Sequence, residues 1–197
     1  MRAFQYLLPQ LNIGQLINIE IEFIPVPIDE YINDKSAFDV FVEYRTSSGE
    51  KGCIGIETKY VDALGRNNPS DMGKKHRVAI ETGCFTPSGL DSIKRSCPQL
   101  IRNFLLIEKY RLRHGFVFSH SLILSLKEDN ESVEEIAALK KLLRRETQSK
   151  IVKLSLEDFV DAVQRYCPEL YRRWINEFYR RYLDFDVVKD YLAIADD

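Results

Sequence analysis

The segment FDVFVEYRTSSGEKGCIGIETKY, residues 38–60, contains the pattern that decides the fold. Apolar and polar side chains alternate over residues 38–45 and again over residues 53–60, and this period of two predicts a β-strand in each case. The stretch TSSGEKG between them, residues 46–52, is rich in residues that favour turns. The segment therefore predicts an antiparallel hairpin.

Three charged side chains take defined positions on this hairpin. Glu57 and Lys59 are two residues apart on one strand, so both leave the same face of the sheet, about 6.7 Å apart along the strand. If the hairpin folds about Ser48, antiparallel pairing sets Asp39 directly opposite Glu57, with their β-carbons roughly 5 Å apart. A slip of one residue would move Asp39 to the other face, so the register is a specific prediction.

Two carboxylates at this separation favour a bound cation, because without one they repel each other. Mg²⁺ is commonly held by one or two carboxylates together with water and phosphate oxygens, and Mn²⁺ is the alternative; the backbone carbonyl of Thr58 offers a further oxygen ligand. A lysine beside the metal, here Lys59, orients an attacking water and offsets charge that develops on phosphorus. The pattern predicts hydrolysis of a phosphodiester.

The rest of the chain alternates between strand and helix patterns. Strands are predicted at residues 17–23, with Ile17, Ile19, Ile21 and Phe23 on one buried face, within residues 116–126, and at residues 150–154. Helices are predicted at residues 70–82 before Gly83, at 98–115, at 132–145 with Ser132 as cap, after the cap Ser155, and from Pro168 to about 182. This order predicts an α/β fold with a central mixed β-sheet flanked by helices.

Length and composition indicate one globular unit. A chain of 197 residues with 45% hydrophobic composition can bury one sizeable core. We therefore expect a single domain, with its core in residues 17–155 and C-terminal helices in residues 156–192. No apolar run approaches the length of a membrane span and the first residues lack a signal-peptide pattern, so the expected location is the cytoplasm.

Two clusters of basic side chains occur in a chain whose net charge is −2. That balance excludes a generally basic protein that coats nucleic acid, although a nuclease needs only a local positive face. The clusters are Lys74, Lys75, His76 and Arg77, and Arg172, Arg173, Arg180 and Arg181. Each is either a solvated helix face or a surface that guides substrate, and in the second case Lys74, Lys75 and Arg77 are expected to bind it.

The four cysteines, at positions 53, 84, 97 and 167, form no CxxC pair, which is typical of reduced, packed thiols. A zinc site from Cys84, Cys97, His114 and His120 is an alternative, but the spacing of these residues matches no zinc motif.

The hairpin residues resemble the PD-(D/E)XK nuclease superfamily, in which an aspartate on one strand is followed by Glu-x-Lys on the next. The match here is Asp39 in SAFDVFVEYR and Glu57, Thr58 and Lys59 in GCIGIETKY. The phrases KSAFDVFVEYR, GIETKY, QLIRNFLL and LSLEDFVDA are similar to an uncharacterised bacterial branch of that superfamily. Phe38 stands where the superfamily's name has proline.

The resemblance implies a restriction endonuclease-like core in which Asp39 and Glu57 bind the metal and Lys59 is the catalytic lysine. It also implies polar residues near the phosphate on the helix that follows, where this chain has Gln99 and Arg102. Many members carry a further acidic residue on a helix before the first strand. About sixteen residues precede that strand here, so the expectation is either a short helix or a missing start of the chain, and Glu20 or Glu22 is the alternative source of the acidic residue.

Three functions remain open from the sequence. The first is a Mg²⁺- or Mn²⁺-dependent nuclease that acts on DNA, and the second is a module of the same fold that binds nucleic acid or protein without catalysis. The third is an assembly subunit that docks through the C-terminal helix YRRWINEFYRRYL. Glu-x-Lys alone is weak evidence, since it occurs by chance about once in a chain of this length. The sequence does not decide between DNA and RNA, between internal and terminal cutting, or between a monomer and a homodimer.

Overall fold

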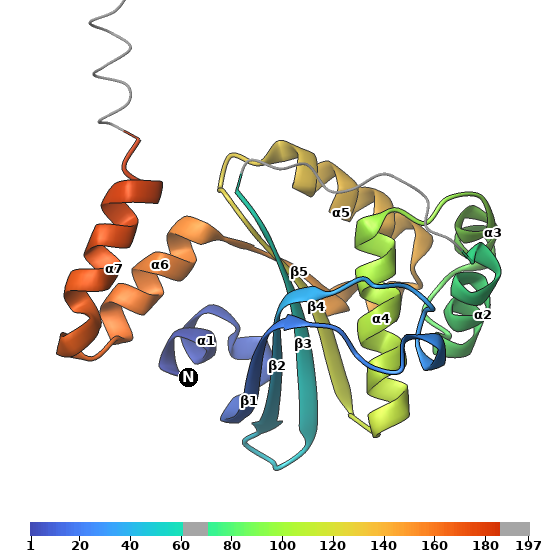
Figure 1. Cartoon of the computed structure of the whole chain (residues 1–197), viewed down its shortest axis with the longest axis horizontal. Coiled ribbons are helices and arrows are strands. Elements are labelled where there is room, and N and C mark those ends of the chain that lie inside the picture. Colours follow the sequence, from blue (N-terminus) through green and yellow to red (C-terminus); the bar gives the residue numbers. More distant parts are fainter. Residues whose placement is uncertain (61–70, 186–197) are drawn as a thin grey trace, which may run out of the picture.

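A five-stranded mixed β-sheet forms the centre of the computed structural model, which describes residues 1–60 and 71–185 (Figure 1). The strands lie in chain order: β1 (Ile13–Phe23), β2 (Phe38–Thr46), β3 (Lys51–Lys59), β4 (Phe118–Ser125) and β5 (Ile151–Ser155). The first three pair antiparallel, and β3, β4 and β5 pair parallel. The predicted α/β fold with a mixed sheet is confirmed.

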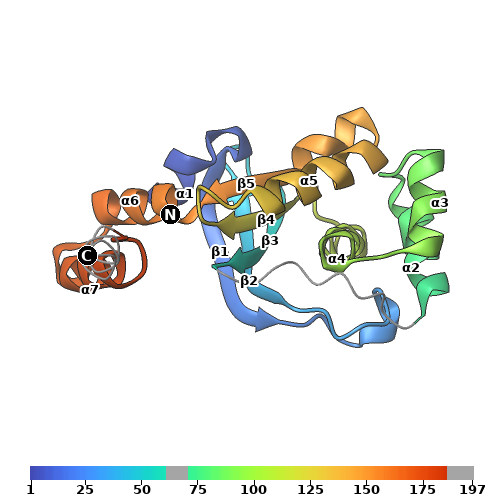
Figure 2. The same ribbon diagram turned by 90° about the horizontal axis from the view of Figure 1, so that it is seen from above.

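Helices cover both faces of this sheet (Figure 2). On one face α4 (Gln99–His114) and α5 (Asn130–Leu142) pack on the strands, and α2 (Met72–Thr82) and α3 (Pro87–Arg95) pack outside these two helices. The other face carries α1 (Arg2–Leu7) and α6 (Leu156–Tyr166), and α7 (Glu169–Tyr182) packs on α6. Short 3₁₀ turns are η1 (Pro9–Leu11), η2 (Ile28–Glu30) and η3 (Arg145–Lys150).

The alternation along the central strands divides the core into two apolar clusters. Phe41 and Cys53 point toward α4 and pack with Phe104. Val42 and Ile54, each one residue further along its strand, belong to the cluster on the opposite face. The period of two in the hairpin therefore positions both layers of the core, as its sequence pattern predicts.

Most predicted helix ends agree with the structure. Gly83 and Gly115 end α2 and α4 with positive φ angles of 66° and 65°, which glycine adopts without steric cost. Ser155 caps α6 by accepting a hydrogen bond from the backbone N–H of Asp158. The cap predicted for α5 was wrong: the helix begins at Asn130, and the Asp129 carboxylate accepts from the N–H of Ser132.

The predicted buried face of the first strand was also wrong. Ile17, Ile19 and Ile21 are 49%, 51% and 76% exposed. β1 lies at the edge of the sheet, and the apolar cluster on its face includes Ile13 but none of these three isoleucines. Only Phe23 turns inward, where its ring stacks on Phe41.

Two further elements were not predicted, namely α1 and α3. The expected start of one helix at residue 70 and the continuation of the C-terminal helices to residue 192 lie outside the described residues. Within residues 1–60 and 71–185, no helix combines the length and the apolar character that crossing a bilayer requires.

Candidate active site

The hairpin of β2 and β3 brings the three predicted charged residues together. The ladder pairs Val40 with Ile56, so the next residues outward along the two strands are Asp39 and Glu57. This is the register predicted for a hairpin folded about Ser48. The Asp39 carboxylate lies close enough to Glu57 for its charge to act on that side chain.

Glu57 is buried, with a side chain 8% exposed, and it accepts three hydrogen bonds. Its Oε1 accepts from Lys59 Nζ at 2.9 Å and from Gln99 Nε2 at 2.6 Å. Its Oε2 accepts from Asn103 Nδ2 at 2.9 Å. A buried carboxylate is costly unless it is hydrogen-bonded and paired with a positive charge, and these contacts meet both needs.

The environment of Glu57 raises the pKa of its carboxyl above the usual value of a glutamate. Burial raises the pKa of Glu57 and the negative charge of Asp39 raises it further, while the hydrogen bonds from Lys59 and Asn103 partly oppose both effects. A cation placed between the two carboxylates would favour the ionised form by the same physics. Titratable groups whose pKa is shifted by burial and by a nearby charge are concentrated at functional sites.

Asp39 is held by the residue that follows Glu57. Its Oδ2 accepts from the backbone N–H of Thr58 and from the Thr58 hydroxyl, each at 2.6 Å. The main-chain ladder between the two strands ends at Val40 and Ile56, and beyond it the aspartate side chain satisfies the N–H of β3. Thr58 therefore fixes the orientation of the carboxylate.

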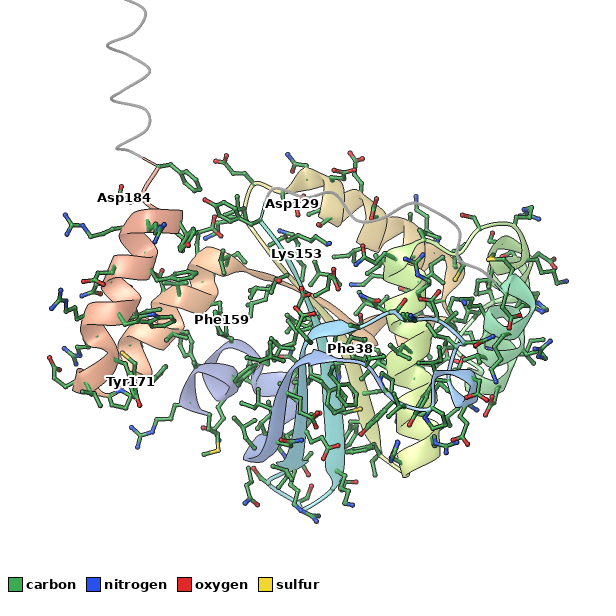
Figure 3. The ribbon with its side chains drawn as sticks, viewed as in Figure 1. Phe38, Asp129, Lys153, Phe159, Tyr171 and Asp184 are labelled. Atoms are coloured by element: carbon green, nitrogen blue, oxygen red, sulfur yellow. The ribbon has the colours of Figure 1, made fainter. Side chains whose placement is uncertain are left out.

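A glycine on β3 makes room for the residue before Asp39. The ring of Phe38 lies over Gly55 and occupies the volume that a β-carbon there would fill. Phe38 is fully buried at the start of β2, on the side of the sheet that faces α4 (Figure 3). This packing anchors the backbone immediately before the aspartate.

Helix α4 supplies the amides that hold Glu57. Gln99 and Asn103 are four residues apart and therefore lie on one face of the helix. Gln99 was predicted as a substrate-binding residue, whereas Asn103, which is only 2% exposed, was missed. The spacing from Gln99 is the signal that would have found it, because the two positions face the same strand.

Arg102, which is predicted as a substrate contact, joins segments of the chain. Its Nε donates to the hydroxyl of Ser36 at 3.3 Å, and its Nη1 donates to the carbonyl of Cys97 at 3.0 Å. Ser36 lies three residues before Asp39, so Arg102 tethers the approach to β2 onto the start of α4.

The sequence matches a known family over nearly its whole length. A profile described as PD-(D/E)XK nuclease superfamily matches residues 1–184. The chain belongs to this superfamily. Comparisons with curated proteins and with solved structures give no match. Asp39, Glu57 and Lys59, which are predicted as the superfamily's Asp and Glu-x-Lys, meet at the end of the hairpin.

The segment before the first strand departs from the superfamily pattern. Helix α1 has six residues and no acidic side chain, and it packs on α6 through Phe4 and Phe159 at 6.1 Å between ring centroids. Of the proposed substitutes, Glu20 accepts a hydrogen bond from Asn18 on the exposed edge strand. Glu22 sits at a positive φ of 56°, where β1 turns before Phe23.

The oxygen ligands near Glu57 suit a hard cation. Residues 1–60 and 71–185 contain no group of three or more His, Cys, Asp or Glu side chains close enough together to hold a metal ion. The alternative zinc site from Cys84, Cys97, His114 and His120 is therefore not formed in this part of the chain. Asp39 and Glu57 are two carboxylates, the number with which Mg²⁺ is commonly held. Asn103 Oδ1 is a buried oxygen that has no hydrogen-bond partner among the described residues. This donor set fits Mg²⁺ or Mn²⁺ and contains no sulfur.

The first basic cluster is divided between the interior and the surface. Arg77 is exposed and Lys74 is half-buried, but Lys75 is fully buried. Its ammonium lies 3.3 Å from Asp34 and donates to the carbonyl of Asn33. Lys75 is therefore an internal ion-pair residue of α2, and the prediction that it binds substrate is not supported by its position.

Proposed function

We propose that this chain is a divalent-metal-dependent phosphodiesterase that cuts nucleic acid, with DNA as its substrate. The observation that carries the proposal is the meeting of two carboxylates and one ammonium at the end of the β2–β3 hairpin. Membership of the nuclease superfamily supports the same chemistry. Carboxylates and an ammonium cost free energy on a partly buried sheet. Their presence together is therefore more typical of a functional site than of a stabilising contact.

Each of the three residues has a distinct role in the proposal. Asp39 and Glu57 bind the metal, with the backbone carbonyl of Thr58 as a further oxygen ligand. Mg²⁺ or Mn²⁺, when bound, activates a water for attack on phosphorus. Lys59 orients that water and offsets negative charge on the phosphate, because its ammonium lies beside Glu57 without taking a ligand position of its own.

Gln99 and Asn103 keep Glu57 in place for this role. Side chains that hold a metal ligand commonly change metal affinity by 10- to 100-fold when they are removed. The Gln99 amide donates to one oxygen of Glu57 and the Asn103 amide donates to the other, so the carboxylate is held in one orientation. Lys74 and Arg77 on α2 are proposed to attract the nucleic-acid backbone through long-range charge.

A binding module without catalysis is the second candidate. The observation that favours it is that Glu57 is already satisfied inside the protein by Lys59, Gln99 and Asn103. A carboxylate with three donors can serve as a structural polar centre. Metal binding decides between the candidates, since a purely structural cluster has no affinity for Mn²⁺.

The test combines metal titration with cleavage of nucleic acid. Supercoiled plasmid, linear duplex and single-stranded oligonucleotides of DNA and RNA are incubated with Mg²⁺ or Mn²⁺, and metal binding is followed by calorimetry. We expect metal-dependent cleavage by the wild type and loss of both binding and cleavage in Asp39→Ala. The matched control is Glu50→Ala, an exposed carboxylate at the opposite end of the same hairpin. A wild type that neither binds metal nor cleaves any substrate would favour the second candidate, and unchanged cleavage by Asp39→Ala would overturn the proposed site.

A further inference from the structure

Helix α7, on the side of the sheet opposite α4, carries a row of aromatic rings that ends at Tyr60, the residue after Lys59. The ring centroids of Trp174 and Phe178 are 5.8 Å apart, and those of Phe178 and Tyr182 are 4.8 Å apart. The row continues onto the end of β3, because the ring of Tyr60 lies 6.1 Å from that of Tyr182. Four rings from two distant segments thus form one continuous series.

The helical repeat explains why three of these rings align. Residues 174, 178 and 182 are spaced four apart, which places their side chains on one face of a helix. The side chain of Ile175 is buried against α6, and Phe178 packs partly against the same apolar cluster, whereas the rings at the two ends of the row are exposed. Trp174, Tyr182 and Tyr60 are 60%, 38% and 40% exposed, so these rings can be reached from solvent.

A direct hydrogen bond joins the row to the strand that carries the candidate catalytic residues. The Tyr60 hydroxyl donates to the main-chain carbonyl of Tyr182 at 2.7 Å. Tyr60 immediately follows Lys59 and lies three residues, or about 10 Å of extended strand, from Glu57. Figure 3 labels Tyr171 near the start of α7 and Asp184 just beyond its end, and the end near Asp184 is directed toward the same side of the molecule as the end of β3.

The charge of α7 suits an anionic ligand. The helix contains four arginines and two glutamates, and Arg172 and Arg173 pair with those glutamates, Glu169 and Glu177. The exposed pair Arg180 and Arg181 lies at the end nearest Tyr60, and the Arg181 guanidinium is 5.6 Å from the centre of the Tyr182 ring. Positive charge is thus concentrated where the aromatic row approaches the site.

We propose that α7 and Tyr60 form a stacking track for single-stranded nucleic acid that leads to Asp39, Glu57 and Lys59. The inference rests on the proposed nuclease function and names the form of the substrate that reaches the site. Exposed rings in series offer a surface to unpaired bases of any sequence, and arginines beside them bind the phosphates. In a duplex the bases are already stacked on one another, so duplex DNA would use the charges but not the rings.

The single tryptophan of the chain, Trp174, reports on this track directly. The full chain is titrated in EDTA, which prevents metal-dependent cleavage, with a single-stranded oligonucleotide and with a duplex of the same length. We expect the single strand to quench Trp174 fluorescence and to bind about tenfold more tightly than the duplex. Binding should weaken with increasing salt because phosphates are contacted.

Variants separate the rings from the charges. Tyr182→Leu retains an apolar side chain but removes one ring, and we expect it to reduce the preference for the single strand severalfold. Arg180→Glu with Arg181→Glu should weaken binding of both forms. Arg145→Glu, at an exposed position in η3, is the matched control and should bind as the wild type does. Circular dichroism confirms that each variant is folded.

The outcomes distinguish this inference from the function on which it rests. Quenching by the single strand without cleavage under any metal condition would support the track and overturn the nuclease proposal. Cleavage by the wild type, with fluorescence unchanged by either oligonucleotide, would overturn the track alone. Equal affinity for both forms in the wild type and in Tyr182→Leu would also overturn it, and would leave the aromatic face of α7 as a surface for a protein partner.

Discussion

The side-chain amide of Asn103 donates a hydrogen bond of 2.9 Å to Oε2 of Glu57, which lies 46 residues away in the sequence. The same asparagine has its Oδ1 buried without a partner among the described residues. Asn103 thus holds Oε2 of Glu57, the proposed metal ligand. It also places its own Oδ1, an oxygen that could bind a metal, beside that carboxylate. No local sequence pattern of β3 records this contact, because the partner comes from α4.

Replacing Asn103 is expected to weaken metal binding. Asn103→Leu keeps a similar volume but removes the donor to Glu57, so we expect the metal concentration for half-maximal cleavage to rise about tenfold or more. Metal titration of the cleavage rate measures the shift. Asn130→Leu, at an exposed position of α5, is the control. An unchanged metal requirement in Asn103→Leu would show that Glu57 needs no support from α4.

Removal of the Lys59 ammonium is expected to reduce the chemical step. Lys59→Ala should lower cleavage of supercoiled plasmid by about a hundredfold or more while the protein still binds metal, since one charge-stabilising donor is lost. Lys51→Ala removes an exposed lysine from the other end of the same strand and should leave the rate unchanged. Equal cleavage by Lys59→Ala and wild type would contradict the role given to this lysine.

The basic residues of α2 are expected to separate into two classes. Lys74→Glu with Arg77→Glu should weaken nucleic-acid binding and reduce its dependence on salt, because fewer phosphate charges are neutralised. Lys75→Met should instead lower the free energy of unfolding by about 1–3 kcal/mol, since the buried ammonium is the partner of Asp34. Binding isotherms at several salt concentrations and urea unfolding give the two measurements. A Lys75→Met protein of wild-type stability would rule out the internal role.

A buried ion pair away from the candidate site is expected to control acid stability. Glu108 is fully buried and pairs with Lys150 at 2.7 Å. Burial opposes ionisation of Glu108, but the positive charge of Lys150 and the donors Lys150 and Ser119 hold the pKa of Glu108 below its usual value. A depressed pKa gives stability that is present above the pKa of the unfolded chain, about 4.3, and is lost as pH falls through the lower folded value.

The test of this pair is urea unfolding as a function of pH. Lys150→Met should lower the free energy of unfolding near neutral pH by about 1–3 kcal/mol, because the buried Glu108 loses its 2.7 Å partner and keeps only Arg111 as a cation. The loss should diminish as the pH falls and Glu108 becomes protonated. Lys109→Met breaks the more exposed pair with Glu81 and should cost under about 1 kcal/mol. A similar cost for both variants would mean that Glu108 gains little from Lys150.

Adding a methyl group at Gly55 is expected to disturb the packing before Asp39. The ring of Phe38 occupies the space of the missing β-carbon, so Gly55→Ala should destabilise the protein by about 1–3 kcal/mol and also lower cleavage. Gly73→Ala in α2 is the matched control, because its β-carbon meets no atom closer than 3.6 Å. That change should stabilise the helix by up to about 1 kcal/mol. Thermal unfolding and plasmid nicking measure both effects.

The sequence alone determined the hairpin and its register. A period of two over both strands excludes a slip of one residue, and a hairpin that folds about Ser48 makes Asp39 the neighbour of Glu57, as the structure has it. The ends of α2 and α4 were equally predictable, since Gly83 and Gly115 supply the positive φ angles that end a helix. These features depend on residues close together in the chain.

Only the tertiary structure decided which patterned faces are covered and which distant side chains meet. Ile19 and Ile21 alternate like buried strand residues, yet they are exposed because β1 lies at the sheet edge and the helices on that side leave them uncovered. The contact between Tyr60 and Tyr182 spans 122 residues, and the buried position of Lys75 beside Asp34 depends on how α2 docks. The repeat of a strand or helix fixes the direction of a side chain relative to its own element, whereas its neighbours are fixed only when the elements pack together.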